Sequence, residues 1–165
     1  MEPEPIRILV VDDEPVICDG CRLILSDRCF DVDSCNSGKT GLEMLLAGEY
    51  DLALLDMKLP DMNGMEILEH VKKDNVGTYI IVMTGYSSVK NAVDAMKLGA
   101  FEYIAKPFTD DELLISVQRA VETKRLKEEN LALRHQLSER YDFGNIIGEN
   151  PEIIKIFDAI RKVAS

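Results

Sequence analysis

Residues 51–64 read Asp-Leu-Ala-Leu-Leu-Asp-Met-Lys-Leu-Pro-Asp-Met-Asn-Gly, an apolar run that ends in an acid and a turn-rich segment. The apolar residues follow one another without alternation, which predicts a strand over residues 51–55 that is covered on both faces. A helical pattern begins at Gly64 and runs to Lys73. A buried strand followed by a helix is the repeating unit of a parallel α/β sheet.

The same alternation of strands and helices extends over about 120 residues. The other predicted strands span residues 6–11, 30–34, 79–83 and 102–104, and the other helices span residues 15–26, 40–46, 88–98 and a long segment from Asp110 onward. The second strand alternates polar with apolar residues, which is typical of a sheet edge. We therefore expect a flavodoxin-like α/β fold: a five-stranded parallel sheet of order 2-1-3-4-5 with helices on both faces, followed by a long helical linker.

The composition, with 46% hydrophobic and 30% charged residues, is that of a soluble globular protein. No apolar run approaches the roughly 18 residues that a membrane helix requires. The acidic N-terminus lacks the basic and apolar regions of a secretory signal, so we expect a cytoplasmic protein without a membrane partner. The formal charge of −11 would repel phosphate backbones, so we expect no direct contact between this chain and nucleic acid.

Three local patterns imitate other sites. Cys18 and Cys21 form a C-x-x-C pair, but they fall inside a helical apolar pattern, and Cys29 and Cys35 flank the second strand. We therefore expect reduced cysteines that behave as small hydrophobic residues, and no zinc or redox centre.

Residues 37–40, Ser-Gly-Lys-Thr, resemble the end of a P-loop, but Asp33 stands where the first glycine is required. We expect Asn36 or Ser37 to cap the second helix instead. Asp61 and Asn63 faintly resemble part of a calcium loop, although the liganding positions of such a loop are not filled.

Acidic and polar residues follow four of the predicted strands at their carboxyl ends. They are Asp12, Asp13 and Glu14 after the first strand, Asp56 after the third, Thr84 after the fourth and Lys106-Pro107 after the fifth. An open α/β sheet binds ligands at this edge, beside the point where the strand order reverses. We therefore expect these side chains to converge.

Crowded carboxylates repel one another unless a cation shares the site, and Mg²⁺ prefers oxygen ligands of this kind. With Mg²⁺ as cofactor, a carboxylate at the centre of the sheet could act as the nucleophile toward a phosphoryl group. Asp56 is the best-placed candidate. Lys106 and Thr84 would then stabilise the charge on the phosphoryl oxygens.

These motifs together resemble the receiver domains of response regulators, over about residues 6–122. The matching segments are Val-Val-Asp12-Asp13-Glu14, Leu-Leu-Asp56-Met-Lys-Leu-Pro60-Asp-Met-Asn-Gly64, Met-Thr84-Gly85 and Tyr103-Ile-Ala-Lys106-Pro107-Phe108. The resemblance implies a phosphoacceptor signalling domain of a two-component system, not an enzyme, in which Asp56 accepts a phosphoryl group from a sensor histidine kinase.

The resemblance also implies roles for the individual residues. The implied metal ligands are Asp13, Asp56 and the backbone carbonyl of Lys58, with Asp12 acting through water. Thr84 and Tyr103 would move together as a switch on phosphorylation. The peptide between Lys106 and Pro107 would be cis.

A capping box, Thr109-Asp-Asp-Glu112, opens a helical pattern that continues through Leu137. Leu126, Asn130, Leu133 and Leu137 are spaced as a heptad seam, with a polar residue among the leucines. This pattern favours a homodimer joined by a parallel coiled coil. The alternative is a monomeric amphipathic helix.

Residues 141–165 are similar to the beginning of the AAA+ ATPase domain in sigma-54-dependent transcription activators of the nitrogen-regulatory type. We therefore divide the chain into a receiver domain (1–122), a helical linker (123–140) and the start of a second domain (141–165). The similarity implies that the natural protein continues beyond Ser165, hydrolyses ATP there, and binds DNA and sigma-54 RNA polymerase. A different output domain is the alternative.

Two other functions fit the predicted fold. A phosphatase or phosphotransferase with an aspartyl intermediate would carry a second acid two residues after the nucleophile, where this chain has Lys58. A flavodoxin-like cofactor binder would need a phosphate-binding loop after the first strand, where Asp12, Asp13 and Glu14 would repel phosphate.

Overall fold

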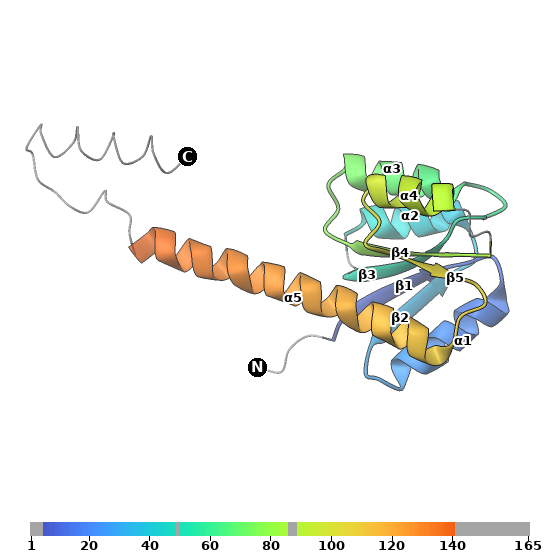
Figure 1. Ribbon diagram of the computed structural model, residues 1–165, viewed down its shortest axis with the longest axis horizontal. Helices are drawn as coiled ribbons and strands as arrows, with labels where there is room; N and C mark the ends of the chain where they lie inside the picture. Colours follow the sequence, from blue (N-terminus) through green and yellow to red (C-terminus); the bar gives the residue numbers. More distant parts are fainter. Residues whose placement is uncertain (1–4, 49, 86–88, 141–165) are drawn as a thin grey trace, which may run out of the picture. The chain divides into compact units, whose positions relative to one another are not determined.

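The strands form one parallel sheet in the computed structural model, in which residues 5–48, 50–85 and 89–140 are described (Figure 1). The sheet has the order β2-β1-β3-β4-β5, so the predicted order is confirmed. The strands are β1 (Arg7–Val11), β2 (Asp31–Cys35), β3 (Leu52–Asp56), β4 (Tyr79–Thr84) and β5 (Glu102–Ala105).

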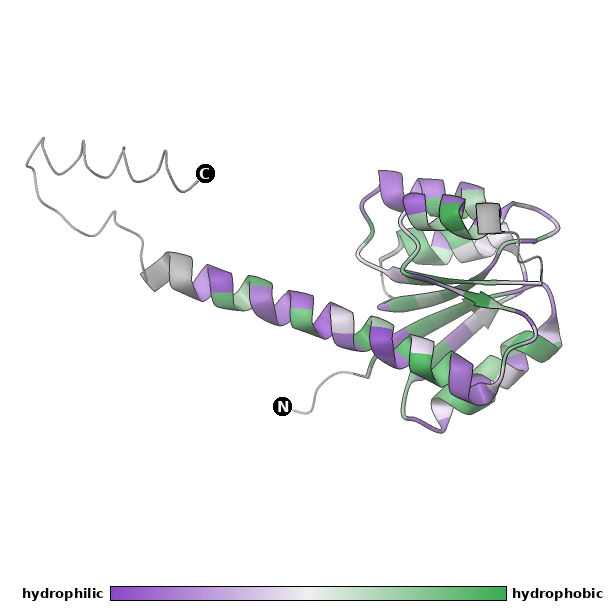
Figure 2. Ribbon diagram, in the orientation of Figure 1, coloured by the Kyte–Doolittle hydropathy of each residue, from purple (hydrophilic) through white to green (hydrophobic). Residues whose placement is uncertain are grey.

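Helices cover both faces of this sheet, as expected. They are α1 (Pro15–Ser26), α2 (Gly38–Leu46), α3 (Gly64–Lys73), α4 (Val89–Lys97) and α5 (Asp110–Arg140). In Figure 1, α2, α3 and α4 lie on one face, and α1 and the first turns of α5 lie on the other. Each layer of helices buries its own cluster of apolar side chains against the sheet. In Figure 2 the inner strands of the sheet are coloured mostly as hydrophobic.

The burial of each strand follows its sequence. Every residue of β3 is buried, whereas the edge strand β2 has no fully buried residue. The predicted ends of β3 and β4 were each one residue short, because Asp56 pairs with Met83 and Thr84 pairs with Ala105 within the ladders. These polar residues are therefore the last residues of rigid strands and not the first residues of loops.

The helix α5 begins at the predicted capping box. The Thr109 N–H donates to Glu112 Oε2 at 2.8 Å, and the Glu112 N–H donates to Thr109 Oγ1 at 3.2 Å. Residues up to Leu126 belong to one compact unit with the sheet, and Lys127 begins a second unit. Among the described residues, no helix combines the length and the apolar character needed to cross a membrane.

The predicted heptad seam lies on the described part of α5, although its last side chain does not. Leu126 and Leu133 are each 52% exposed, and Asn130 is exposed as well. The side chain of Leu137 and the whole predicted second domain, residues 141–165, lie outside the described residues.

The cysteines are reduced, and the hydrophobic interpretation holds for two of them. Cys18 and Cys21 are buried on the inner face of α1, where burial, with a smaller effect of the nearby Asp12 carboxylate, raises their pKa values to about 11 and about 12. Cys35 is partly buried at the end of β2. The expectation was wrong for Cys29, which is exposed in the turn after α1 with φ of 64°.

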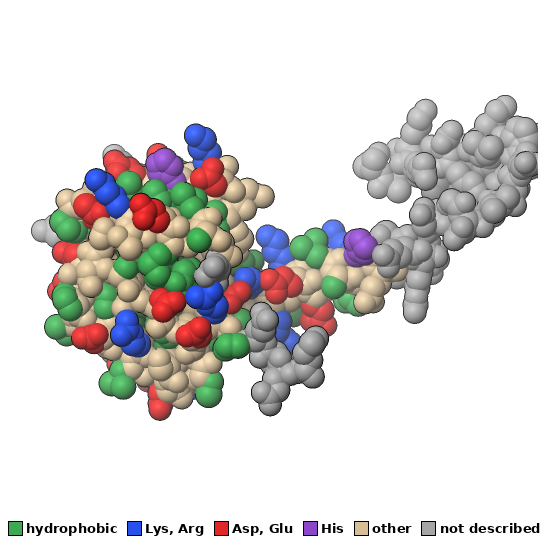
Figure 3. Space-filling view, turned by 180° about the vertical axis from the view of Figure 1, so that it is seen from behind, with side chains coloured by type: hydrophobic (Ala, Val, Ile, Leu, Met, Phe, Trp, Pro, Cys, Tyr) green, Lys and Arg blue, Asp and Glu red, His purple; other side chains and the backbone are tan. Residues whose placement is uncertain are grey.

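The surface mixes charges of both signs. Figure 3 shows acidic side chains interspersed with basic ones over one face of the sheet-containing unit, with apolar side chains between them. On this face the acidic side chains are therefore not gathered in one block.

The N-terminus of α2 is capped from two directions. Ser37 is the N-cap, as predicted, and its Oγ accepts the Thr40 N–H at 3.4 Å. The carboxylate of Asp61, from the loop after β3, accepts the Gly38 N–H at 2.8 Å and the Lys39 N–H at 2.9 Å. These hydrogen bonds, with one from the Ser37 hydroxyl, lower the pKa of Asp61 to about 2. A carboxylate at a helix N-terminus is stabilising, so the β3–α3 loop is fixed on α2.

Gly41 brings α2 into close contact with β1. A Cβ atom at this position would lie 2.7 Å from Val11 Cγ1 and 2.8 Å from Val11 Cγ2. Val11 is buried and β-branched, so it cannot turn aside. We predict that Gly41→Ala lowers the free energy of unfolding by roughly 1–3 kcal/mol, measured by urea denaturation.

The matched control is Gly20→Ala on α1, where no atom lies within 4 Å of the added Cβ. Alanine favours a helix by about 1 kcal/mol over glycine, so this variant should be more stable than the wild type. Equal shifts in the same direction for both variants would contradict the proposed close contact.

The Asp61 cap predicts a pH-dependent stability. Because the folded pKa of about 2 lies below the ordinary 3.8, the ionised carboxylate stabilises the fold fully above about pH 4. This contribution is lost as the pH falls through about 2. The difference in thermal midpoint between the wild type and Asp61→Asn should therefore be constant from pH 7 to about pH 4 and shrink below it. A difference that does not change with pH would show that the charge of Asp61 is unimportant.

Candidate functional site

A pocket opens at the carboxyl edge of the sheet, where β1 and β3 lie side by side and the strand order reverses. Its lining residues are Asp13, Glu14, Ile17, Asp56, Lys58, Thr84, Gly85, Lys106 and Pro107. The structure thus brings together the polar residues that the sequence placed after four different strands.

Three carboxylates meet at this pocket. Asp12, Asp13 and Asp56 each offer an oxygen atom within 4.8 Å of the others, a grouping that could hold a metal ion. Asp12 is fully buried and Asp56 is 5% exposed, whereas Asp13 is open to solvent. Ionised carboxylates at this separation repel one another, and burial further increases the free-energy cost of ionising them.

Hydrogen bonds from the main chain orient two of these carboxylates. Asp12 Oδ1 accepts the Glu14 N–H at 3.0 Å, and Asp56 Oδ1 accepts the Lys58 N–H at 3.4 Å. Each contact reaches two residues along the chain, into the loop that follows the strand. The orientation of each carboxylate is therefore fixed both by the end of its strand and by the first residues of the following loop.

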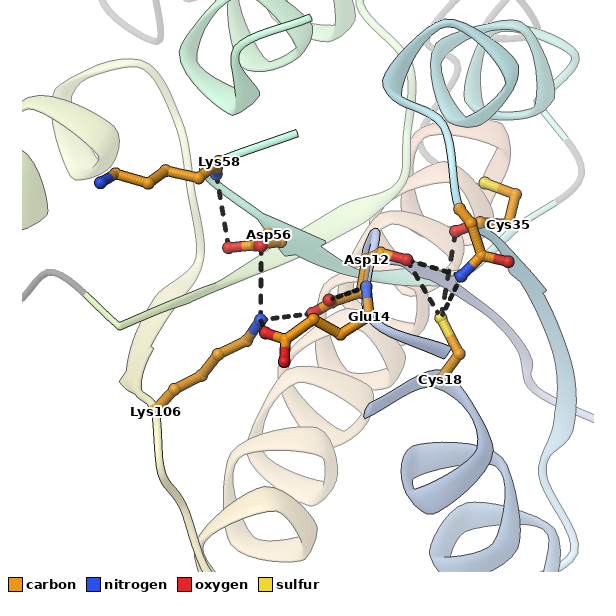
Figure 4. A network of polar contacts seen from close by, with 8 residues as sticks. Asp12, Glu14, Cys18, Cys35, Asp56, Lys58 and Lys106 are labelled. Atoms are coloured by element: carbon orange, nitrogen blue, oxygen red, sulfur yellow. Dashed lines mark hydrogen bonds and ion pairs between the residues drawn. The ribbon is translucent and has the colours of Figure 1, made fainter. Parts of the chain in front are cut away.

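The ammonium of Lys106 lies among the acids (Figure 4). Its Nζ is 2.6 Å from Asp12 Oδ2, 3.3 Å from Asp56 Oδ2 and 3.6 Å from Glu14 Oε1. Lys106 follows β5 directly, and its peptide bond to Pro107 is cis, as predicted. One cation from the edge strand therefore bridges acids from two central strands.

The pKa values reflect this balance. Burial raises the pKa of Asp12, more than the hydrogen bond from Lys106 and the backbone hydrogen bond lower it. Burial alone would lower the pKa of Lys106, but hydrogen bonds and attraction from Asp12 and Asp56 raise it above the ordinary value. Lys106 therefore stays charged at neutral pH. Three carboxyl groups surround this one ammonium, so the site would still attract a second cation.

Thr84 and Tyr103 lie on neighbouring strands beside this pocket. Thr84 ends β4, is 3% exposed and lines the pocket. Tyr103 pairs with Val82 in the ladder and packs, half-buried, against the cluster under α2, α3 and α4. Burial raises the pKa of Tyr103. Thr84 therefore faces the pocket, and Tyr103, on the next strand, packs against one helical layer.

Two residues near the site were not singled out for it from the sequence. The Asn36 side-chain amide donates to the Asp12 carbonyl at 2.8 Å, and the Cys18 thiol donates to the same oxygen at 3.4 Å. Asn36 had been considered only as a helix cap and Cys18 only as a core residue. No local pattern signals these contacts. The Asn36 contact depends on how the β2–α2 loop passes over the end of β1, and the Cys18 contact joins α1 to the same point.

Known proteins are similar in sequence to this chain. The family model of the response regulator receiver domain matches residues 8–118. The regulatory protein AtoC of Escherichia coli (strain K12) is 35% identical over 96% of this chain and 34% of its own length. The transcriptional regulatory protein ZraR of the same strain is 32% identical over 99% of this chain and 36% of its own length. The chain therefore spans about a third of the length of these relatives.

Solved structures agree with this relationship. A CheY-like response regulator receiver domain protein from Methanospirillum hungatei JF-1 has a TM-score of 0.72 and 35% identity, covering 75% of this chain and 99% of that one. The beryllofluoride-activated NtrC4 receiver domain dimer has a TM-score of 0.68 and 30% identity, covering 72% and 98%. From the family match and the shared fold it follows that this chain belongs to the response regulator receiver domain family.

Proposed function

We propose that Asp56 is the phosphoacceptor of this receiver domain and that it accepts a phosphoryl group from a sensor histidine kinase with Mg²⁺ bound beside it. The observation that supports this most directly is the meeting of Asp12, Asp13 and Asp56 around the Lys106 ammonium. A divalent cation would offset the repulsion among these carboxylates. Transfer of a phosphoryl group to one of them would change the charge of the cluster.

Among the three acids, Asp56 is best placed for the transfer. Asp12 is fully buried and held at 2.6 Å by Lys106, and Asp13 stands in solvent. Asp56 ends the central strand, lines the pocket and shares its walls with Thr84 and Lys106. An oxygen of Asp56 attacks the phosphorus, the bond to the donor's leaving group breaks, and that group keeps the bonding electrons.

The residues present fit a Mg²⁺ ion. Asp13, Asp56 and the backbone carbonyl of Lys58 would hold it directly, and Asp12 would act through water. Oxygen donors and an open side of the pocket suit the incomplete protein shell that Mg²⁺ accepts. Bound there, Mg²⁺ would neutralise charge on the phosphoryl oxygens. Lys106 and Thr84 supply an ammonium and a hydroxyl to the same oxygens.

The same geometry supports a switch. A phosphoryl group on Asp56 takes the Lys106 ammonium and the Thr84 hydroxyl as partners. The movement of Thr84 opens space beside β5, and Tyr103 turns into it. The change would then reach β5 and α4, because Thr84 pairs with β5 in the ladder and Tyr103 is part of β5. Such a switch depends on contacts that differ between the two states.

We further propose that the chain is the regulatory part of a dimeric sigma-54-dependent transcription activator. Residues 1–122 would be the receiver, 123–140 the linker and 141–165 the beginning of an AAA+ domain. In an activator of this class, the AAA+ domain would hydrolyse ATP, and the whole protein would bind DNA and sigma-54 RNA polymerase. The names of the relatives, which include a transcriptional regulatory protein, and the dimeric NtrC4 receiver structure support this assignment.

Treatment with acetyl phosphate and Mg²⁺ tests the phosphoacceptor. We predict a phosphoryl adduct on the wild type by intact mass, and none on Asp56→Asn, because the amide is not a nucleophile for this transfer. Asp74→Asn, which makes the same change in an exposed acid after α3, should keep the adduct. An undiminished adduct on Asp56→Asn would reject the assignment.

The heptad seam predicts a difference between two exposed leucines of α5. Leu133 lies on the seam and Leu131 lies off it, with similar exposures of 52% and 57%. Burying a leucine stabilises an interface by roughly 1.5–3 kcal/mol, so Leu133→Asp should weaken the dimer by at least about tenfold.

Leu131→Asp carries the same change in charge and should leave the dimer intact. Light scattering over a range of protein concentrations measures both. Equal effects of the two substitutions, or a monomeric wild type, would contradict the predicted seam.

A further inference from the structure

We propose that Asn36, on the loop between β2 and α2, is a positioning residue for the Mg²⁺ site because it joins the two loops that carry the metal ligands. The inference rests on the proposed function, since it assumes that Asp13, Asp56 and Lys58 hold the ion. It concerns a residue that touches neither the ion nor the phosphoryl group.

The first connection runs from Asn36 to the loop after β1. The Asn36 Nδ2 donates to the Asp12 carbonyl at 2.8 Å and approaches the Cys18 sulfur at 3.5 Å. The Cys18 thiol donates to the same carbonyl at 3.4 Å (Figure 4). This carbonyl belongs to the planar peptide between Asp12 and Asp13. Holding it therefore fixes the direction in which the Asp13 backbone leaves β1.

The second connection runs from the next two residues to the loop after β3. The Ser37 hydroxyl donates to Asp61 Oδ2 at 2.8 Å, and the Gly38 N–H donates to Asp61 Oδ1 at 2.8 Å. Gly38 is also buried against this loop, where an added Cβ would lie 3.0 Å from Met62 Cβ. Asp61 is three residues from Lys58, whose carbonyl is the proposed third ligand.

Residues 36–38 thus form a short brace with one end on each ligand-bearing loop. Mg²⁺ requires near-ideal octahedral geometry at about 2.0–2.1 Å, so its affinity depends on the distance between the two loops. Lys106 cannot replace the brace, because it pulls the acid side chains together and does not orient the main chain. Cys18 alone is a weak donor. Loss of the Asn36 amide should therefore loosen the Asp12–Asp13 backbone.

The test is calorimetric titration of the whole chain with Mg²⁺. Residues that orient metal ligands typically change affinity by 10–100-fold when removed, and we expect Asn36→Ala to raise the Kd for Mg²⁺ on the order of tenfold. The thermal midpoint in EDTA should hardly change, because Asn36 is exposed. A purely structural role would instead lower the midpoint and leave the Kd unchanged.

Lys39→Ala, in the first turn of α2, is the matched control. Lys39 contributes its main-chain N–H to Asp61, and its side chain is exposed, so the Kd should stay within about twofold of the wild type. Cys18→Ala and Cys18→Ser form a second pair. The serine hydroxyl can still donate to the Asp12 carbonyl, so Cys18→Ser should bind Mg²⁺ more tightly than Cys18→Ala.

Different results would reject the brace and the Mg²⁺ site. A wild-type Kd for Asn36→Ala, or equal weakening by Asn36→Ala and Lys39→Ala, would overturn the brace while leaving the Mg²⁺ site in place. A wild-type protein that takes up no Mg²⁺ would overturn the metal site itself, and the brace with it.

Discussion

Repulsion among carboxylates at one edge of the sheet is the constraint on which the rest of this structure depends. Asp12 and Asp56 end or follow two adjacent central strands, and both are buried. The Lys106 ammonium lies between them and offsets their mutual repulsion, at 2.6 Å from one and 3.3 Å from the other. The burial of a charge is costly unless it is paired. Because the acids are at the ends of β1 and β3 and the ammonium follows β5, these three strands must end at the same edge of the sheet.

The fold serves this constraint by making the strand ends rigid. Two apolar layers hold the central strands from both sides, and β3 is buried along its whole length. The loops that leave those strands are fixed to each other by Asn36 and Asp61. A site built in this way is rigid at its acids and open on the side where a phosphoryl donor would approach. A change in the charge of Asp56 would therefore change the contacts of its neighbours, Lys106 and Thr84.

Much of this could be predicted from the sequence, because the apolar runs of β1, β3 and β4 and the polar residues at their ends are local patterns. The strand order and the convergence of acids follow from them. The exact strand ends do not, since Asp56 and Thr84 are polar and still continue their ladders. Cys29 was misplaced because a turn residue beside a strand resembles a core residue in sequence. Asp61 and Asn36 were missed because their partners lie more than 20 residues away along the chain.

The most direct test of the central claim is the unfolding free energy of Lys106→Met, measured by urea denaturation in EDTA and in Mg²⁺. Removing the ammonium leaves the buried carboxylates without their cationic partner, which should cost roughly 3–5 kcal/mol in EDTA. Mg²⁺ should then stabilise the variant more than the wild type, because the ion no longer competes with an ammonium for the acids. A variant that is as stable as the wild type in EDTA, and indifferent to Mg²⁺, would contradict the account.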